Sequence, residues 1–121
     1  MKKVLIAEDS SVIQNLTKKI LQFQNYEIDA VKNGFEVLKY LETKKPDIIL
    51  LDINMPVMNG IECIKQIRAS ENEEIAKIPV IAISGNAANY TLDYLTAVGF
   101  TEYLPKPINF DILVETVKKY T

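Results

Sequence analysis

Short apolar runs in this sequence each lead to a side chain that could take part in metal or phosphoryl chemistry. The runs and the groups that follow them are residues 3–7 with Glu8 and Asp9, residues 47–51 with Asp52, residues 79–83 with Ser84, and the segment that approaches Lys106. The point just past the end of a buried strand is where an open parallel sheet presents its ligand site. Three carboxylates, a hydroxyl and an ammonium at one sheet edge therefore suit an acidic metal site that accepts a phosphoryl group.

The charge of this set favours a bound divalent cation. Glu8, Asp9 and Asp52 bring three negative charges and Lys106 returns one positive charge, which leaves −2. Such a cluster repels an incoming phosphoryl group unless a cation neutralises it. Mg²⁺ fits best, because it prefers oxygen ligands and binds through few carboxylates while it keeps several waters.

The bulk composition predicts one globular domain over residues 1–121. Apolar residues make up 48% of the chain and charged residues 25%, the balance of a soluble protein. No stretch approaches the roughly 20 apolar residues that a membrane span needs, and the start at Met1-Lys2-Lys3 does not fit a signal peptide. We therefore expect a cytoplasmic protein without membrane insertion.

Several chemistries are disfavoured by what the chain contains. A net charge of −2 and an isoelectric point near 5.2 argue against direct nucleic-acid binding. The chain has no histidine, which excludes imidazole catalysis and an internal phosphohistidine. The single cysteine, Cys63, cannot form an internal disulfide and lies in a helical pattern, so we interpret it as a small core or surface residue and not as a nucleophile.

Strand and helix patterns alternate along the chain. We predict strands at residues 3–7, 27–31, 47–51, 80–83 and 102–104, and helices at 10–24, 35–41, 61–67, 88–98 and from Pro107 or Asn109 through Val117. Ser10 or Ser11 can cap the first helix, and Gly99 can end the fourth. Residues 70–77 are interpreted as a solvated connection, although their first part can extend the preceding helix. Repeated strand–helix units imply right-handed crossovers, with helices on both faces of a parallel sheet and a flavodoxin-like α/β fold.

With these residues at the ends of successive strands, the chain closely resembles, over its whole length, the receiver domain of two-component response regulators. The motifs that carry the resemblance are Glu8-Asp9, Asp52-Ile53-Asn54-Met55-Pro56-Val57-Met58-Asn59-Gly60, Ser84, and Lys106-Pro107. The resemblance implies a doubly wound five-stranded parallel sheet of order 2-1-3-4-5, the order of the family's chemotaxis member. It also implies a phosphoprotein that works as a switch in signal transduction, in a two-component system or phosphorelay.

The resemblance assigns the acidic residues their roles. Asp52 would be the phosphoacceptor, whose carboxylate attacks a phosphohistidine on a sensor histidine kinase or a histidine phosphotransfer protein. Asp9, Asp52 and the backbone carbonyl of Asn54 would ligate Mg²⁺ or Mn²⁺. Glu8 would act through water, as the matching acid of relatives often does, although its side chain is one methylene longer than the aspartate of many relatives. Asn54 and Asn86 stand where the family tunes the lifetime of the acyl phosphate.

The same resemblance predicts how phosphorylation at Asp52 changes the rest of the domain. Lys106, followed by a cis bond to Pro107, would pair with a phosphoryl oxygen, and Ser84 would donate a hydrogen bond to it. Ser84 and Tyr103 would form the switch: Ser84 moves toward the phosphoryl group, and Tyr103 turns inward and changes a partner-binding surface. The effector that recognises the changed surface would be a downstream protein or an attached domain. The chain would catalyse only its own phosphotransfer and slow self-dephosphorylation, and so would not be an enzyme in the usual sense.

Two further pairs of side chains have open interpretations. Tyr90 and Tyr94 lie four residues apart on the predicted helix 88–98, where they form either a partner-binding patch or a local helix contact. Ile13 and Leu16 follow the acid pair, where relatives dock the phosphodonor. We expect Leu16 to pack in the core, while Ile13 is open to either role.

Other functions of the same general fold fit the residues less well. Hydrolases of the haloacid dehalogenase class need a second acid two residues after the nucleophile, where this chain has Asn54. A flavin or nucleotide module needs a glycine-rich phosphate loop after the first strand, where Glu8-Asp9 would repel phosphate. A receiver used only as an interaction domain is a third reading, although no essential group is missing. The residues leave open whether the receiver stands alone or belongs to a hybrid kinase or longer regulator, and its oligomeric state.

Overall fold

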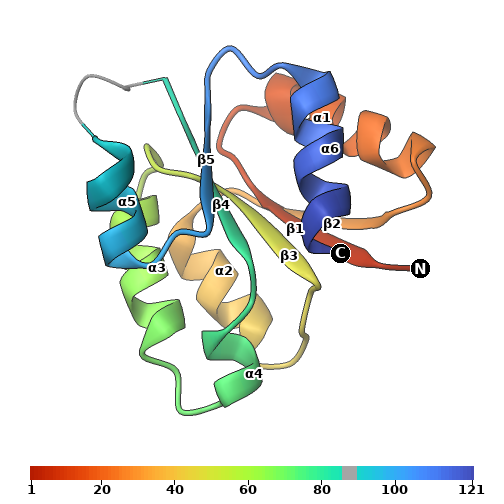
Figure 1. Ribbon diagram of the computed structural model, residues 1–121. Helices are drawn as coiled ribbons and strands as arrows, with labels where there is room; N and C mark the ends of the chain where they lie inside the picture. Colours follow the sequence, from red (N-terminus) through yellow and green to blue (C-terminus); the bar gives the residue numbers. More distant parts are fainter. Residues whose placement is uncertain (86–89) are drawn as a thin grey trace.

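A five-stranded sheet lies at the centre of the protein, whose computed structural model describes residues 1–85 and 90–121 (Figure 1). The strands are β1 (Lys3–Ala7), β2 (Glu27–Val31), β3 (Ile48–Asp52), β4 (Val80–Ser84) and β5 (Glu102–Pro105). All neighbouring strands pair in parallel, in the order β2-β1-β3-β4-β5. The predicted doubly wound sheet of order 2-1-3-4-5 is thereby confirmed.

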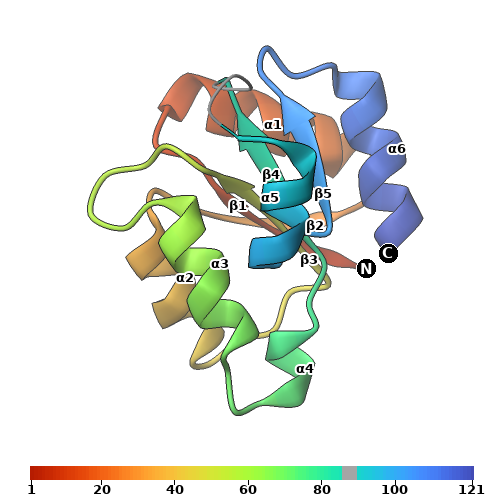
Figure 2. The same ribbon diagram turned by 60° about the vertical axis from the view of Figure 1, so that its left-hand side comes forward.

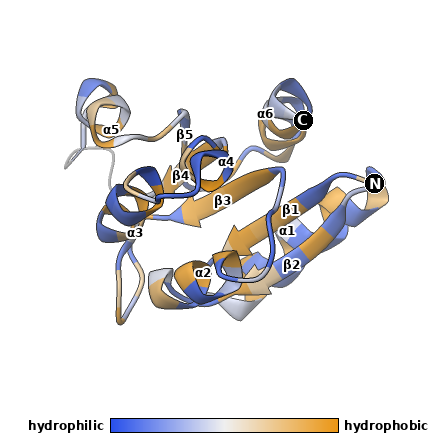
Figure 3. Ribbon diagram, turned by 90° about the horizontal axis from the view of Figure 1, so that it is seen from below, coloured by the Kyte–Doolittle hydropathy of each residue, from blue (hydrophilic) through white to orange (hydrophobic). Residues whose placement is uncertain are grey.

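Helices cover both faces of this sheet, and the strand side chains alternate between two cores. The helices are α1 (Ser11–Phe23), α2 (Gly34–Leu41), α3 (Gly60–Arg68), α4 (Glu73–Ala76), α5 (Leu92–Val98) and α6 (Phe110–Tyr120). Val4 and Ile6 of β1 pack with α1 and α6, whereas Leu5 and Ala7 pack with α2, α3 and α5. Because both faces are covered, β3 and β4 are buried along their whole length, and most of β3 has the colour of hydrophobic residues in Figure 3.

Side-chain caps begin the helices at the places that the sequence indicates. Ser10 caps α1 and Asn109 caps α6, which decides between the alternatives predicted for these helices. Gly99 ends α5 with φ 124°, a backbone conformation that favours glycine. The predicted cis bond between Lys106 and Pro107 is present.

The structure corrects several predicted boundaries. Asp52 and Ser84 are the last residues of β3 and β4 rather than the first residues after them. The connection at 70–77 contains the four-residue helix α4, whose Ile75 is buried in the core. This helix lies at the end of the molecule opposite to the carboxyl ends of the strands (Figures 1 and 2). A single buried apolar residue is too weak a periodic signal to predict so short a helix.

Two predictions for the helices are wrong in part. Helix α5 begins at Leu92 with Thr91 as its cap, so Tyr90 lies before the helix, while the predicted start at 88 and Asn86 fall outside the described residues. Leu16 is 46% exposed instead of packed in the core. In the described part of the chain, no helix has the length and apolar character to span a membrane.

Candidate metal and phosphoryl site

The register of the parallel strands brings the predicted site residues together. Ala7 pairs with Leu51, so Glu8 and Asp52, the residues that follow them, lie side by side at the carboxyl edge of the sheet. On the other side of β3, Ser84 pairs with Pro105, which places Lys106 one residue beyond β5 at the same edge. Four separate chain segments therefore meet only because the sheet folds in this order.

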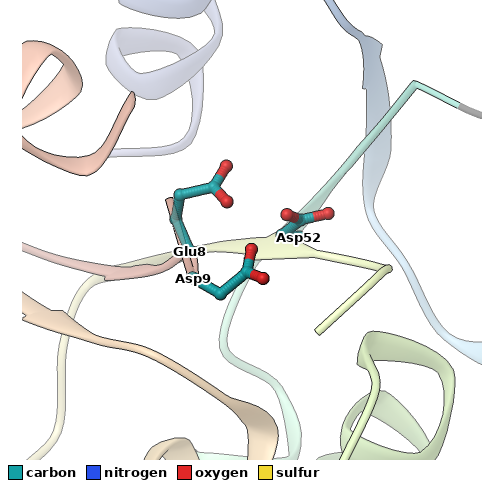
Figure 4. A group of neighbouring side chains, drawn as sticks. All are labelled: Glu8, Asp9 and Asp52. Carbon is teal, nitrogen blue, oxygen red and sulfur yellow. The ribbon is translucent and has the colours of Figure 1, made fainter. Parts of the chain in front are cut away.

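Three carboxylates form the centre of the site. One oxygen from each of Glu8, Asp9 and Asp52 lies within 4.8 Å of the others, and Figure 4 shows the three side chains converging from β3 and the end of β1. Glu8 is 4% exposed and Asp52 3% exposed, while Asp9 is exposed. A set of closely spaced carboxylate oxygens, open to water on one side, fits a hard divalent cation such as Mg²⁺.

Lys106 supplies the positive charge of the site. Its Nζ lies 2.9 Å from Oε1 of Glu8 and 2.9 Å from Oδ2 of Asp52. Partial burial lowers the pKa of Lys106, but hydrogen bonds and charge interactions with Glu8 and Asp52 outweigh that effect and raise the pKa overall. The ammonium therefore stays charged and bridges the two buried carboxylates.

Backbone amides bind the remaining oxygens of the buried carboxylates. The N–H of Ser10 donates to Oε2 of Glu8 at 3.2 Å, and the N–H of Asn54 donates to Oδ1 of Asp52 at 3.1 Å. Both oxygens of Glu8 thus already hold donors from the chain. Asn54 is exposed beside the site, so the predicted ligand residue lies next to the phosphoacceptor candidate.

The predicted switch residues meet at the end of β4. Ser84 is 1% exposed, and its backbone carbonyl accepts hydrogen bonds from the Lys106 N–H at 2.9 Å and the Tyr103 hydroxyl at 3.2 Å. Tyr103 is half-buried and packs against the core on the side of α5. The Ser84 carbonyl therefore links the end of β4 both to the backbone of Lys106, just after β5, and to the Tyr103 side chain of β5.

A close backbone approach explains the glycine that ends the Asp52 motif. A Cβ atom at Gly60 would lie 2.6 Å from the carbonyl oxygen of Asp52, nearer than side chains approach backbone atoms. The Gly60 N–H also donates to the Ile53 carbonyl at 2.8 Å. Glycine lets α3 begin directly against the end of β3, which holds the Asp52 backbone in place.

Other residues singled out in the sequence lie as follows. The Cys63 thiol is buried and donates to the Gly34 carbonyl at 3.6 Å; burial raises its pKa to about 12, as befits a packing residue. The rings of Tyr90 and Tyr94 stack with centroids 6.0 Å apart. Ile13 and Leu16 line an apolar cavity together with Lys106, Pro107, Ile108 and Phe110.

Gln14 is a residue of the site that the sequence gives no reason to select. Its side-chain amide donates to the backbone carbonyls of Glu8 and Val31, next to the acid pair. A polar residue on an amphipathic helix carries no signal of such a long-range contact. The contacts of Gln14 become apparent only from the packing of α1 against the ends of β1 and β2.

The fold and site together match known receiver domains. Residues 4–118 match the family model of the response regulator receiver domain. The chain is 32% identical over 119 residues to the polar-differentiation response regulator DivK of Brucella anthropi, an alignment that covers 98% of this chain and 95% of DivK. It is 34% identical to the CAI-1 autoinducer sensor kinase/phosphatase CqsS of Vibrio cholerae, where 96% of this chain spans only 17% of the relative.

Solved structures agree with these relatives. The chemotaxis response regulator CheY4 of Vibrio cholerae superposes with a TM-score of 0.89 at 30% identity, and the match covers 100% of this chain and 99% of CheY4. The receiver domain of the sensor histidine kinase PA1611 from Pseudomonas aeruginosa has a TM-score of 0.88 at 28% identity, covering 98% and 96% of the two chains, and its structure holds a magnesium ion in the active-site cleft.

This chain belongs to the response regulator receiver domain family. It is a phosphoacceptor domain of two-component signalling, with the acidic cluster of Glu8, Asp9 and Asp52 at the expected active site. Receiver domains of this kind take phosphoryl groups from histidine kinases.

Proposed function

We propose that Asp52 is the phosphoacceptor of this receiver domain and that Lys106, Ser84 and the neighbouring acids assist the transfer. The observation that carries the proposal is the position of the Asp52 carboxylate. It is nearly buried, lies within 4.8 Å of two further carboxylates and is bound to the Lys106 ammonium at 2.9 Å. A carboxylate that serves only as a surface group has no need of such surroundings.

The division of the metal ligands follows the roles that the receiver family implies. Asp9, Asp52 and the backbone carbonyl of Asn54 would hold Mg²⁺ or Mn²⁺, and Glu8 would act through water. When bound, the cation would neutralise carboxylate charge that otherwise repels a phosphoryl group. The Asp52 carboxylate would attack the phosphorus while the P–N bond to the imidazole of the donor phosphohistidine breaks and the imidazole leaves, and the oxygens of the new acyl phosphate would become acceptors for Lys106 and for the Ser84 hydroxyl.

Phosphorylation at Asp52 would change the contacts of Lys106 and Ser84. The Lys106 ammonium would exchange its bond to Asp52 for one to the phosphoryl group, which carries roughly −1.5 to −2 charge. Ser84 and Lys106 are linked through their backbones, and Tyr103 donates to the same Ser84 carbonyl. A shift of the β4 end would therefore release Tyr103 to turn further inward and alter the surface of α5, β5 and α6.

The phosphodonor would be a sensor histidine kinase or a histidine phosphotransfer protein. The effector that recognises the phosphorylated domain would be a downstream protein or an attached domain. The domain would speed only its own phosphotransfer and slow self-dephosphorylation. The single domain over residues 1–121 and the cytoplasmic location expected from the sequence stay predictions. CqsS, in which the matching segment is a small part of a sensor kinase, supports a hybrid-kinase origin, while DivK supports a stand-alone regulator.

Intact-mass measurement after incubation with a small phosphodonor tests the proposal. Wild-type protein with Mg²⁺ and acetyl phosphate or phosphoramidate should gain one phosphoryl group, and EDTA should abolish the gain. Asp52→Asn should gain none, whereas the matched surface variant Asp93→Asn on α5 should behave like the wild type. An adduct on Asp52→Asn at the wild-type level would refute the assignment.

A further inference from the structure

The side chain of Gln14 holds the backbone directly before Asp9, the exposed acid of the site. The carboxamide nitrogen of Gln14 donates to the Glu8 carbonyl at 3.1 Å and to the Val31 carbonyl at 3.0 Å. The backbone N–H of Gln14 donates to the Ser10 carbonyl at 2.9 Å. The Glu8 carbonyl belongs to the peptide group that joins Glu8 to Asp9, so the Gln14 side chain holds the backbone directly before Asp9, while the bond to Ser10 is an ordinary contact in the first turn of α1.

This arrangement matters because Asp9 has less support from packing than the other acids. Glu8 and Asp52 are buried and are bridged by Lys106, whereas the Asp9 side chain is exposed. The direction of an exposed carboxylate depends chiefly on the backbone that carries it. The Val31 carbonyl at the end of β2 accepts two hydrogen bonds, one from the Gln14 carboxamide and one from the Glu8 N–H at 3.1 Å. Gln14 therefore also links the end of β2 to the residue that follows β1.

We infer that Gln14 is a positioning residue of the metal site: its carboxamide fixes the peptide group that joins Glu8 to Asp9 and so aims the Asp9 carboxylate at the cation. The inference rests on the proposed function, in which Asp9 and Asp52 hold Mg²⁺. Groups that orient metal ligands without touching the metal commonly change its affinity 10–100-fold when they are removed.

The length and the hydrogen-bond donors of the Gln14 side chain determine which substitutions keep its positioning role. An amide nitrogen carries two N–H donors, enough for two carbonyl acceptors, and glutamine has the length to reach them from α1. Methionine has similar length and volume but no donor. Asparagine keeps the amide and is one methylene shorter, so it falls short of both carbonyls.

Mg²⁺ titration of metal-free protein tests the inference, with Gln14→Met compared to Gln22→Met. Gln22 is exposed near the end of the same helix, so the control carries the same change away from the site. We expect the Kd for Mg²⁺ measured by calorimetry to rise about tenfold in Gln14→Met and to stay at the wild-type value in Gln22→Met. In EDTA, the amide hydrogens of Asp9 and Ser10 should exchange faster in Gln14→Met alone.

The dependence of phosphorylation on Mg²⁺ separates positioning from a general loss of structure. The Mg²⁺ concentration for half-maximal phosphorylation by acetyl phosphate should rise about tenfold in Gln14→Met, while the rate at saturating Mg²⁺ equals that of the wild type. A Kd within twofold of the wild type would overturn the inference. If Gln14→Met does not fold, the same titration of Gln14→Asn decides between these two outcomes.

The wild-type titration separates a failure of the Gln14 inference from a failure of the proposed function. Wild-type protein that binds Mg²⁺ and is phosphorylated, together with Gln14 variants of equal Mg²⁺ affinity, would overturn the role of Gln14 and leave the proposed function standing. Wild-type protein that neither binds Mg²⁺ nor accepts a phosphoryl group would overturn the proposed function, and the role of Gln14 with it.

Discussion

Replacement of Lys106 by methionine should destabilise the metal-free protein, because Lys106 is the cation between two buried carboxylates. The side chains of Glu8 and Asp52 are 5% and 4% exposed, and each lies 2.9 Å from the ammonium. Removal of one partner of a buried ion pair costs about 3–5 kcal/mol. Since the Lys106 side chain is 23% exposed, water screens part of the loss, and we expect about 3 kcal/mol, the lower end of that range.

Urea denaturation followed by circular dichroism in EDTA measures this loss in the free energy of unfolding. Lys119→Met is the matched control, because Lys119 pairs with Glu102 at 3.0 Å but is 66% exposed. Exposed pairs contribute about 0–1 kcal/mol, so the control should stay close to the wild type. A loss in Lys106→Met no larger than in Lys119→Met would refute the argument that Lys106 neutralises buried charge.

Magnesium and pH should change the effect of the Lys106→Met substitution in defined directions. Mg²⁺ at 100 times the Kd of the variant should stabilise Lys106→Met by about 2.7 kcal/mol relative to its metal-free form, because the cation neutralises carboxylate charge that Lys106 no longer balances. The pKa of Lys106 is raised in the folded state. Its contribution should therefore persist up to the ordinary lysine pKa of about 10.4 and disappear only as pH rises through the higher folded value.

Predictions for three other sites, Gly60, Tyr40 and Tyr103, follow from the geometry. Gly60→Ala places a Cβ 2.6 Å from a backbone oxygen and should cost about 3 kcal/mol in urea denaturation, whereas Gly85→Ala, with its nearest atom at 3.6 Å, should be tolerated. In Tyr40→Phe, Asp29 loses the hydrogen bond, 2.6 Å long, that chiefly lowers its pKa. The variant should lose about 1 kcal/mol at neutral pH, and the difference should fade in acid titration as Asp29 protonates; a difference independent of pH would contradict this. Tyr103→Ala should keep the phosphoryl adduct yet lose the changes in amide exchange over β5 and α6 that beryllofluoride induces in the wild type, and equal loss of both would argue against a switch.

The sequence predicts the parts of this protein that depend on local pattern. Continuous apolar runs such as residues 47–51 identify strands buried on both faces. The residues that end these runs, Asp52 and Ser84, meet at one edge because all strands run parallel. The strand order itself needed the family resemblance, since apolar periodicity carries no information about which strands are neighbours.

What the sequence does not predict depends on contacts between distant segments. The ion pair of Glu8 with Lys106 joins residues from opposite ends of the chain, and the Gln14 contacts require α1 to lie over the ends of two strands. Leu16 follows the helical period but faces the cavity beside Lys106 instead of the core, because periodicity does not fix the angle at which α1 packs. Short α4 depends on one buried residue, Ile75, and its neighbours in the core.

The most direct test of the central claim is to locate the phosphoryl group in the chain. Protein phosphorylated with acetyl phosphate and Mg²⁺ is treated with borohydride, which reduces an aspartyl phosphate to homoserine, and its peptides are sequenced by tandem mass spectrometry. The account predicts homoserine at position 52 and aspartate at position 9. Homoserine at position 9, or an adduct that resists reduction and maps to a serine such as Ser84, would contradict it.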